Sequence, residues 1–530
     1  IFPPEWVFEP WAGGGGGRWR NGPLQDIALE QMAAMKKFHE LDIPHSGFYA
    51  EGAGATFFGE YKKEELYKVV SFGERHGFKV FSWQFPNMTQ ELAQELLPEC
   101  PKEELPITRN KNDEEEKLPV YIDFSHPRAK ELLAAQWKDR MDAGIRGSMV
   151  DFGDVVPDEA VFYDGRRGDE MHNAYAYQYA KNYRELFEQK YGDDHVLYTR
   201  GAAPGSQHFA CQFGGDQLTS FQGLKYAIAG GLSAAASGLP FWGVDAGGYD
   251  GFPDQETYLR WTEYAAFCPL MRFHGTEPRE PWEYDAFTVK VYRYYTWLRE
   301  NLRPYIVSVA AEAHKLGIPM MRPLAMMYPE DQEATKVWDE YLFGEDLLVA
   351  PVSDETEERE IYFPEGRWIS LWNLNDEISG PVQRSVEVPI DKIQVYIREG
   401  SFLPLRLNES LKLGESMSES ETEMILAVVP QNDSIVKETL YERSGAKTCC
   451  GMEKNGETIQ LQISGRTAEL YVMLAGIHWK NTEAIVNGRT LTKVTAREGL
   501  YFTEGYLELE EGILVKINPS AESVIKIQKK

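Results

Sequence analysis

Gly147-Ser-Met-Val-Asp151-Phe-Gly-Asp154 is the stretch of this chain that points most directly to its fold. Small and apolar residues occupy its first four positions, as in a short buried strand, and acidic residues follow in a loop. A second loop, Phe213-Gly-Gly-Asp216, presents another carboxylate after two glycines. Hydrolysis of a glycosidic bond needs two carboxyl groups, one to attack the sugar carbon and one to protonate the leaving oxygen. The two loops therefore predict glycoside chemistry.

Around this stretch the chain alternates helical and strand-like segments from about residue 24 to about residue 310. Expected helices span residues 24–41, 64–76, 127–143, 173–191, 221–237 and 258–267, and expected strands span residues 43–49, 78–83, 147–150, 196–199, 240–244 and 271–273. Repeated β–α units form parallel sheets, and seven or eight of them form a (β/α)8 TIM barrel. We therefore expect an α/β fold with such a barrel.

The pattern changes near residue 317, where short alternating segments separated by turn residues begin. Ile459-Gln-Leu-Gln-Ile463 is an example, and similar alternation continues to the end of the chain. Such alternation is typical of strands that bury one face in a β-sandwich. We expect three domains, namely a catalytic barrel at 1–315, a proximal C-terminal β-sandwich at 316–405 and a distal C-terminal β domain at 406–530.

The composition narrows the range of partners. A chain of 530 residues exceeds a single compact core, and its net charge of −28 disfavours nucleic acid and anionic lipid as partners. No run of about 18 apolar residues indicates a membrane span. We expect an oligosaccharide or glycoside partner, no nucleic acid and no membrane, and a homo-oligomer is compatible with the sequence. Ile1 indicates a mature or trimmed form, so the compartment stays open between cytoplasmic and secreted.

Polar residues follow many of the predicted strands, where a barrel of this kind gathers its catalytic groups at one face. They are Glu51, Asn87, Asp123, Asp151, Asp154, Arg200, Asp216, Asp245, Arg272 and His274. A set rich in carboxylates with one histidine suits glycosyl chemistry better than a zinc centre. A magnesium site formed by Asp151, Asp154 and Asp245 is an alternative. Each aspartate could instead cap the following helix, but five successive strand ends favour a shared function.

The ordered motifs of the chain resemble those of glycoside hydrolase family 31, the retaining α-glucosidase and α-xylosidase group. The likeness extends over almost the whole chain, and its order is far more specific than any single motif. The motifs are Pro3-Pro-Glu-Trp6, Val120-Tyr-Ile-Asp-Phe-Ser-His-Pro127, Asp151-Phe-Gly-Asp154, Gly215-Asp216-Gln217, Gly243-Val-Asp245-Ala-Gly-Gly-Tyr249, Arg272-Phe-His274 and Leu347-Leu-Val-Ala-Pro351.

The resemblance implies a double displacement that needs no cofactor and no metal. Asp151 would attack the anomeric carbon and form a covalent glycosyl-enzyme, while Asp216 would protonate the leaving oxygen and later activate a water. We expect Arg200 to keep Asp151 ionised, and a dry, like-charged setting to keep the proton on Asp216. By resemblance, Asp154 orients the nucleophile loop and Arg200, Asp245 and His274 hydrogen-bond sugar hydroxyls. The implied substrate-binding set is Glu51, Asp154, Arg200, Asp245, Tyr249, Arg272 and His274.

The nucleophile motif is closest to a variant of the family that has Asp-Phe-Gly-Glu there and that includes sulfoquinovosidases. Those enzymes grip a sulfonate with an Arg-x-x-Trp pair after the first strand, and residues 50–70 of this chain contain neither arginine nor tryptophan. The net charge of −28 gives no attraction to an anionic substrate either. A neutral α-glycoside is therefore favoured over a sulfoquinovoside.

Departures from the family lie around the pocket for the non-reducing sugar. Glu51 stands where the family has the aspartate that binds the 4-hydroxyl, Met149 where it has tryptophan, and His208 where it has arginine. No stretch resembles the family's N-terminal β-sandwich. We expect an exo-acting, α-glucosidase-like hydrolase, with α-galactosides, α-xylosides and α-N-acetylgalactosaminides as alternative substrates.

Two functions compete with hydrolysis. A carbohydrate-binding homologue without catalysis is the alternative of another class, and the presence of both Asp151 and Asp216 argues against it. A transglycosylase or lyase would use the same glycosyl-enzyme, and the sequence does not separate it from a hydrolase.

Overall fold

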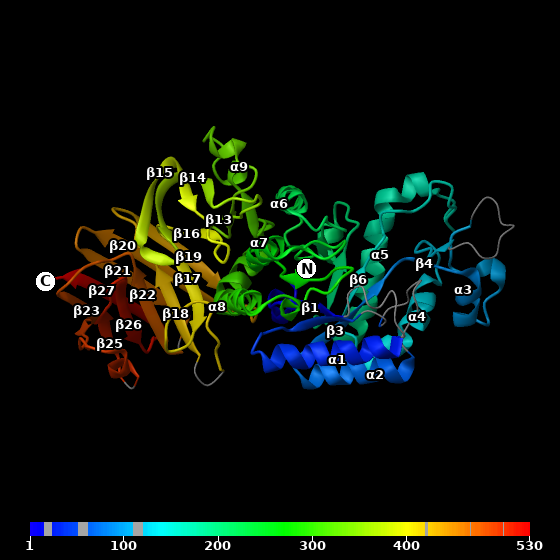
Figure 1. Cartoon of the computed structure of the whole chain (residues 1–530), viewed down its shortest axis with the longest axis horizontal. Helices are drawn as coiled ribbons and strands as arrows, with labels where there is room; N and C mark the ends of the chain where they lie inside the picture. The colour runs from blue at the N-terminus through cyan, green and yellow to red at the C-terminus, as the bar shows by residue number, and fades with distance from the viewer. Residues whose placement is uncertain are drawn as a thin grey trace. The chain divides into compact units, whose positions relative to one another are not determined.

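The computed structural model describes residues 1–14, 24–50, 53, 62–109, 120–418, 422–466, 468–501 and 503–530. The chain divides into two compact units. The first contains residues 1–223, 241–254 and 270–285, and the second contains residues 224–240, 255–269 and 286–530. In Figure 1 the first unit is mostly blue to green and the second is mostly green to red.

The first unit is built around a barrel of eight parallel strands. They are β1 (Trp11–Gly14), β2 (Gly47–Ala50), β3 (Lys79–Gln84), β6 (Gly147–Val150), β7 (Val196–Thr199), β8 (Cys211–Phe213), β9 (Trp242–Gly243) and β10 (Arg272–Phe273). Neighbours pair in parallel in the order β10-β1-β2-β3-β6-β7-β8-β9. A parallel bridge between Gly243 and Leu270 joins the two ends of this order. The predicted barrel is confirmed.

Aromatic side chains fill the interior of the barrel. The ring of Trp11 lies 5.1 Å from that of Phe81 and 5.8 Å from that of Tyr198, and all three residues are buried. A β carbon at Gly47 would lie 2.7 Å from the Phe81 ring and 2.9 Å from the Trp11 ring, so glycine leaves room for both. The barrel is therefore a packed core whose chemistry is confined to its strand ends.

Helices follow the strands as the alternation predicts. Those of the first unit outside the insertion are α1 (Leu24–Glu40), α2 (Lys63–Arg75), α4 (Ala129–Ala143) and α5 (Gly168–Tyr191). An insertion between β3 and α4 carries α3 (Gln90–Leu96) and an antiparallel ribbon of β4 (Asn87–Met88) and β5 (Val120–Tyr121). The Thr89 hydroxyl caps α3 by accepting the Leu92 N–H at 3.1 Å. The insertion contacts the loop that follows β6, where the N–H of Tyr163 donates to the Asp123 carboxylate.

The helices α6 (Phe221–Ala236), α7 (Gln255–Ala266) and α8 (Ala286–Leu316) continue the alternation, and nearly all of their residues belong to the second unit. Although α8 is 31 residues long, neither it nor any other helix of the described ranges is apolar enough over a sufficient length to span a membrane.

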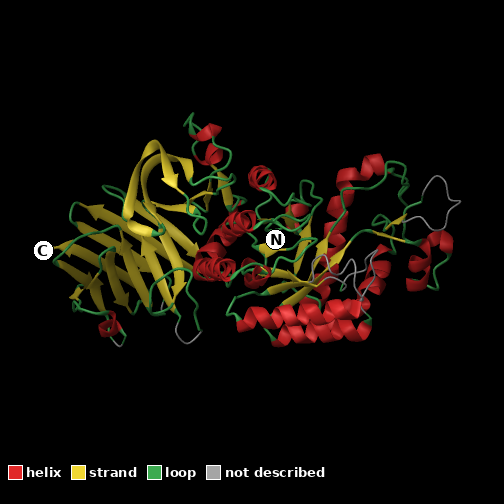
Figure 2. Ribbon diagram, in the orientation of Figure 1, coloured by secondary structure: helices red, strands yellow, loops and turns green. Residues whose placement is uncertain are grey.

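A six-stranded sheet follows these helices in the chain. Its order is β11-β12-β13-β16-β14-β15, and its pairs are antiparallel. The strands are β11 (Met321–Pro323), β12 (Tyr341–Phe343), β13 (Leu347–Ala350), β14 (Glu358–Ser370), β15 (Asn373–Glu387) and β16 (Gln394–Arg398), with the short helix α9 (Leu324–Met327) beside them. Figure 2 shows the long hairpin of β14 and β15. Leu342, Phe363 and Trp368 belong to the apolar core of this sheet.

The last part of the chain is a β-sandwich. One sheet has the order β17-β18-β22-β26-β25 and the other β19-β20-β21-β27-β23-β24. Both sheets contribute to one buried apolar core, for example through Leu426 and Val515 of the first and Leu461 and Ile525 of the second. The strands are β17 (Phe402–Leu407), β18 (Glu423–Val428), β19 (Ile435–Tyr441), β20 (Lys447–Asn455), β21 (Thr458–Ser464), β22 (Leu470–Ala475), β23 (Thr482–Val486), β24 (Arg489–Thr490), β25 (Gly505–Glu508), β26 (Gly512–Ile517) and β27 (Glu522–Lys529).

Candidate active site

The carboxyl ends of β6, β7, β8, β9 and β10 deliver polar side chains to one face of the barrel. Asp151, Arg200 and Asp245 follow their strands within two residues, and Asp216 follows β8 after two glycines. His274 comes directly after β10. Because all these strands are parallel, their ends share one face, and the structure brings together residues that lie up to 123 positions apart in the sequence.

Asp151 is almost fully buried, with 5% of its side chain exposed. The indole Nε1 of Trp83 donates to its Oδ2 at 3.0 Å, and the backbone N–H of Phe152 donates to its Oδ1 at 2.8 Å. Burial raises the pKa of Asp151, while Arg200, Trp83 and the Phe152 N–H oppose that rise. The carboxylate is therefore held in one orientation by contacts that favour its ionised form.

Phe152 adopts a left-handed backbone conformation with φ of 57°, which is uncommon for a bulky residue and costs of the order of 1 kcal/mol. Its ring lies 6.1 Å from the Trp83 ring, and the guanidinium carbon of Arg200 lies 4.2 Å from its centre. These contacts hold the strained turn that follows the nucleophile candidate Asp151.

Arg200 lies among the carboxylates of the site. Its Nε is 3.3 Å from Asp151 Oδ1 and 3.8 Å from Asp154 Oδ1, and its Nη1 is 3.8 Å from Asp216 Oδ2. A β carbon at Gly215 would lie 3.1 Å from Arg200 Cδ, and the φ of Gly215 is 76°, so both the backbone conformation and the tight contact favour glycine here. The guanidinium of Arg200 thus faces three carboxylates in addition to the Phe152 ring. Its predicted contact with a sugar hydroxyl stays a prediction.

Asp216 differs from Asp151 in exposure, with 48% of its side chain accessible. It lies near the Arg200 guanidinium in a partly solvated position rather than in the dry setting that the sequence suggested, while the carboxyl groups of Asp151 and Asp245 lie near enough to interact with it electrostatically. The two carboxylates thus approach the same cation, with Asp151 buried and Asp216 half-exposed.

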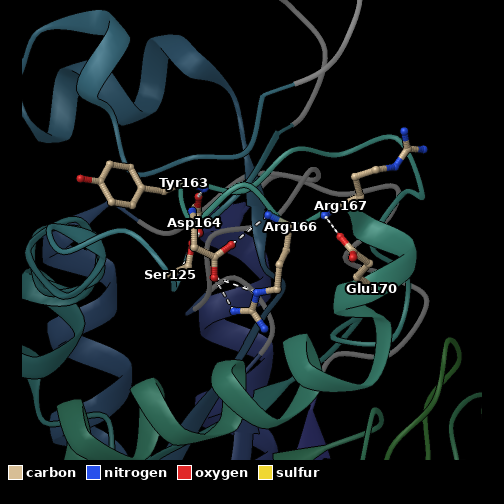
Figure 3. A network of polar contacts seen from close by, with 7 residues as sticks. Ser125, Tyr163, Asp164, Arg166, Arg167 and Glu170 are labelled. Carbon is tan, nitrogen blue, oxygen red and sulfur yellow. Dashed lines mark hydrogen bonds and ion pairs between the residues drawn. The ribbon is translucent and has the colours of Figure 1, made fainter.

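The loop after β6 is anchored to the insertion by a polar network (Figure 3). Buried Asp123 accepts the N–H of Tyr163 at 2.5 Å and both the N–H and the hydroxyl of Ser125. The Ser125 hydroxyl also accepts the Asp164 N–H at 3.3 Å, and Asp164 pairs with Arg166 at 2.5 Å. Asp123 therefore does not follow a barrel strand as expected. It follows β5 of the insertion and anchors the loop that begins with Asp151 and Asp154.

Asp245 and Arg272 form a wholly buried ion pair, with Arg272 Nη1 2.8 Å from Asp245 Oδ1. Burial raises the pKa of Asp245 to about 7, although the Arg272 guanidinium opposes that rise. Arg272 also donates to the Met149 sulfur at 3.5 Å and lies 4.7 Å from the centre of the Tyr198 ring. Arg272 therefore connects the aromatic residues inside the barrel to Asp245, which follows the end of β9. The predicted contacts of the pair with substrate stay predictions.

His274 is buried between two tyrosine rings, 4.5 Å from Tyr49 and 5.6 Å from Tyr249. Burial lowers the pKa of His274 well below its ordinary value, and Arg272 and Arg279 act in the same direction. The imidazole is therefore neutral, and a neutral ring can donate one hydrogen bond and accept another.

Arg279 holds the loop that carries Tyr249. Its guanidinium Nη2 donates to the carbonyls of Gly248 at 2.7 Å, Tyr249 at 3.2 Å and Gly251 at 2.7 Å. Neither this role of Arg279 nor the contact of Trp83 with Asp151 was predicted from the sequence. Trp83 lies near the end of β3, and the adjacent strand β6 is followed by Asp151. A tryptophan at the end of a strand next to one that is followed by a carboxylate is a signal that could have identified Trp83.

Three other positions that the sequence singled out are Glu51, Met149 and His208. Glu51 lies outside the described residues. Met149 is buried beneath the site, and His208 lies exposed in a short 3-10 helix, Ser206–His208. Among the residues with described positions, no group of three or more histidine, cysteine, aspartate or glutamate side chains is arranged to hold a metal ion. Arg200 supplies the positive charge between Asp151 and Asp216.

Two family models match the chain. Residues 5–309 match the glycosyl hydrolases family 31 TIM-barrel domain, and residues 317–403 match the glycosyl hydrolase family 31 C-terminal domain. The first match spans more than half of the chain and contains every residue of the site described above.

Individual relatives agree with the family models. An isomaltosyltransferase of Sporosarcina globispora is 31% identical over 430 residues, covering 76% of this chain and 39% of that protein. A sulfoquinovosidase of Escherichia coli is 32% identical over 297 residues, covering 53% of this chain and 43% of that protein. The chain thus spans about two fifths of the length of these relatives.

A solved structure shares the fold over the full length of the chain. The cycloalternan-forming enzyme from Listeria monocytogenes, solved with a pentasaccharide substrate, has a TM-score of 0.88 and 22% identity. The match covers 100% of this chain and 55% of that enzyme.

Proposed function

Because this chain belongs to glycoside hydrolase family 31, we propose that it is a retaining, exo-acting α-glycosidase that removes a non-reducing terminal sugar. One observation carries this proposal. Asp151, buried and held by hydrogen bonds, and Asp216, half-exposed, lie within 4.0 Å of the same Arg200 guanidinium. A retaining mechanism needs two carboxyl groups about 5–5.5 Å apart with different tasks, and a shared cation supports such closeness.

Each carboxyl group suits a different step. Asp151 attacks the anomeric carbon, and the bond from that carbon to the leaving oxygen breaks while Asp216 gives its proton to that oxygen. Water then attacks the glycosyl-enzyme, Asp216 takes the proton from the water, and the bond to Asp151 breaks. The hydrogen bonds from Trp83 and the Phe152 N–H supply the ionised, oriented nucleophile. Two inversions at one carbon give net retention.

The proposed substrate is a neutral α-glucoside. One relative is named an isomaltosyltransferase, and one similar structure is named a cycloalternan-forming enzyme. Both names denote chemistry on α-glucans. The net charge of −28 disfavours a sulfonated sugar, despite the likeness to a sulfoquinovosidase. α-Galactosides, α-xylosides and α-N-acetylgalactosaminides remain alternatives because Met149 and His208 depart from the family pattern and Glu51 is not described.

Glycosyl transfer is a second candidate activity. It uses the same covalent intermediate with a sugar hydroxyl in place of water, and the relative that matches 76% of this chain is a transferase.

For the domain organisation, we propose the division into a barrel at 1–315 and two following β domains. Because β17 pairs with β18, we propose that the distal domain begins with β17 at residue 402, slightly before the boundary between 405 and 406 that the sequence suggested.

Turnover of aryl α-glycosides tests the proposed function. Wild-type protein is assayed with gluco, galacto, xylo and N-acetylgalactosamino donors, and the anomer released first is identified by proton NMR. We expect turnover of at least one donor with release of the α-anomer, and a loss of about 10⁴-fold or more in Asp151→Asn. Release of the β-anomer, or no turnover of any donor by folded protein, would overturn the proposal.

A further inference from the structure

The exposure of the two carboxylates sets the direction in which a leaving group departs. Asp151 lies at depth with 5% of its side chain exposed, whereas Asp216 is 48% exposed. A group that protonates the leaving oxygen lies beside the bond that breaks. The part of a substrate that leaves must therefore lie on the solvent side of Asp216 and contact the loops next to that residue.

The loop after β9 borders the loop that carries Asp216. Leu218 pairs with Asp250 in a parallel bridge, and the Thr219 hydroxyl donates to the Asp250 carbonyl. The Tyr249 N–H donates to the Gln217 carbonyl at 2.8 Å. These contacts begin one residue after Asp216, so residues around 250 lie next to the acid/base candidate.

Phe252, two residues after Asp250, presents an aromatic ring to solvent, with 48% of the residue exposed. Its ring is stacked on that of Tyr284, with centroids 4.9 Å apart and planes inclined by 22°. The Tyr284 hydroxyl donates to the Pro253 carbonyl at 2.8 Å. Tyr284 thus covers one face of the Phe252 ring and holds the ring in place, while the remainder stays accessible.

The backbone that carries Phe252 is held equally firmly. The Gly251 N–H donates to the Thr276 hydroxyl at 2.9 Å, and its carbonyl accepts from Arg279 at 2.7 Å. A rigid aromatic surface binds at a lower entropic cost than a mobile one. Leu218, 55% exposed, adds apolar surface on the neighbouring loop.

We propose that Phe252, supported by Tyr284 and flanked by Leu218, is the binding surface for the sugar on the leaving-group side of the cleaved bond. This inference rests on the proposed function. The faces of a pyranose that carry axial C–H groups are apolar, and an aromatic ring offers them dispersion contact without removing hydroxyls from water. An exposed ring with a fixed orientation, on a loop that contacts the residues directly after Asp216, fits that requirement. The ligand class is a neutral hexopyranose, either as the departing sugar or as an incoming acceptor.

The same surface selects an acceptor over water. In transfer, a hydroxyl oxygen of the bound sugar attacks the anomeric carbon, the bond from that carbon to the Asp151 carboxylate breaks, and the hydroxyl proton passes to Asp216. The atoms balance as they do in hydrolysis, with the sugar hydroxyl in place of water. A sugar held on Phe252 therefore raises the share of glycosyl-enzyme that goes to transfer.

The test compares two substrates that carry the same sugar on one side of the cleaved bond but differ on the leaving-group side. An α-glycosyl fluoride of the accepted sugar has no ring to place on Phe252, whereas a disaccharide of that sugar has one. We expect Phe252→Ala to lower kcat/KM for the disaccharide about tenfold and to leave the fluoride unchanged. We expect Phe252→Tyr to restore the disaccharide value, and the ratio of transfer to hydrolysis with added sugar acceptor to fall in Phe252→Ala. Tyr226→Ala, which removes a 64% exposed ring of α6, is the matched control.

The outcomes are distinct. Equal losses on fluoride and disaccharide, or an unchanged disaccharide value, would overturn the assignment of Phe252 while wild-type turnover leaves the proposed function standing. Failure of wild type on every donor, the fluorides included, would instead overturn the proposed function.

Discussion

Trp83 and Asp151 are joined by a hydrogen bond of 3.0 Å from the indole Nε1 to carboxylate Oδ2, although 68 positions separate them in the chain. Parallel pairing of β3 with β6 brings them together, with Trp83 opposite Met149 and Gln84 opposite Val150. The bond engages one carboxylate oxygen and so limits how Asp151 can turn. This contact is the basis of the first prediction.

Trp83→Phe keeps an aromatic ring but removes the donor. Because the indole helps to hold down the pKa of Asp151, its loss raises that pKa, and the acidic limb of kcat/KM against pH moves to higher pH. We expect kcat/KM to fall about 10- to 100-fold, corresponding to about 1.5–3 kcal/mol for a hydrogen bond to a charged group. Trp137→Phe, which removes the buried indole donor to Tyr183, is the control. An unmoved acidic limb in Trp83→Phe would contradict the role given to the indole.

Arg200→Gln removes the cation between the carboxylates. Arg200 opposes the rise in the pKa of Asp151, so we expect the acidic limb to move upward and kcat to fall by about 10²-fold. If Arg200 positions carboxylates rather than the sugar, KM changes little, and Arg200→Lys recovers part of kcat because it keeps the charge. Measurements of kcat and KM across pH distinguish positioning of the carboxylates from binding of the sugar. A rise in KM at constant kcat would assign Arg200 to sugar binding instead.

Gly215→Ala displaces the Arg200 side chain. The new methyl group would lie 3.1 Å from Arg200 Cδ, and its φ of 76° adds strain of the order of 1 kcal/mol. We expect activity to fall more than stability. Gly77→Ala carries a comparable φ of 83° with no atom within 4 Å, so it separates backbone strain from displacement of Arg200. Equal effects of both substitutions on kcat/KM would mean that the contact with Arg200 is unimportant.

Asp216→Ala removes the acid/base candidate but leaves Asp151 in place. With an activated donor the glycosyl-enzyme still forms, because a good leaving group needs little protonation. Azide then attacks in place of activated water, since it needs no base, and the product is the α-glycosyl azide. We expect turnover to rise about tenfold or more with azide, as followed by chromatography of that product. Absence of rescue in folded protein, or a β-azide, would reassign the acid/base.

Asp245→Asn leaves the buried guanidinium of Arg272 without its anion. We expect the free energy of unfolding to fall by about 3–5 kcal/mol, measured by urea titration. The pKa of Asp245 is about 7 in the fold and ordinary when unfolded, so the folded state binds the extra proton between these values. Its contribution to stability therefore falls as pH rises through that range, and Asp245→Asn removes this slope. A double change with Arg272→Met should recover stability. An unaltered pH slope in Asp245→Asn would contradict the raised pKa.

The barrel was largely predictable from local patterns. Residues 147–150 and 196–199, expected as strands from apolar runs, form β6 and β7 with those bounds, and α1 ends one residue before the expected limit. β1 and β8 were not expected, because β1 ends in two glycines and β8 has only three residues. A strand that short carries no periodicity, and its pairing partners alone define it.

The site was predictable only as a set of candidates. Asp151, Asp216, Asp245 and His274 follow strands in the chain, so their presence on one face follows from the parallel barrel. The sequence placed Asp123 at the end of a barrel strand, yet it follows β5 of the insertion, and its side chain is buried in contacts with the Ser125 and Tyr163 backbone. The position after a strand says which end of the barrel a residue reaches, but the direction of its side chain depends on neighbours distant in sequence.

The sequence by itself determined most of the strand–helix order, and hence most of the residues at the carboxyl ends of the strands, because apolar periodicity and loop chemistry are local properties. Only the tertiary structure decided that Arg200 lies among the carboxylates of Asp151, Asp154 and Asp216, and that Asp245 and Arg272 are wholly buried. Those relations depend on the strand order and closure of the barrel, which set the distances between residues that no local interaction connects. The charge state and exposure of each carboxyl group follow from those distances.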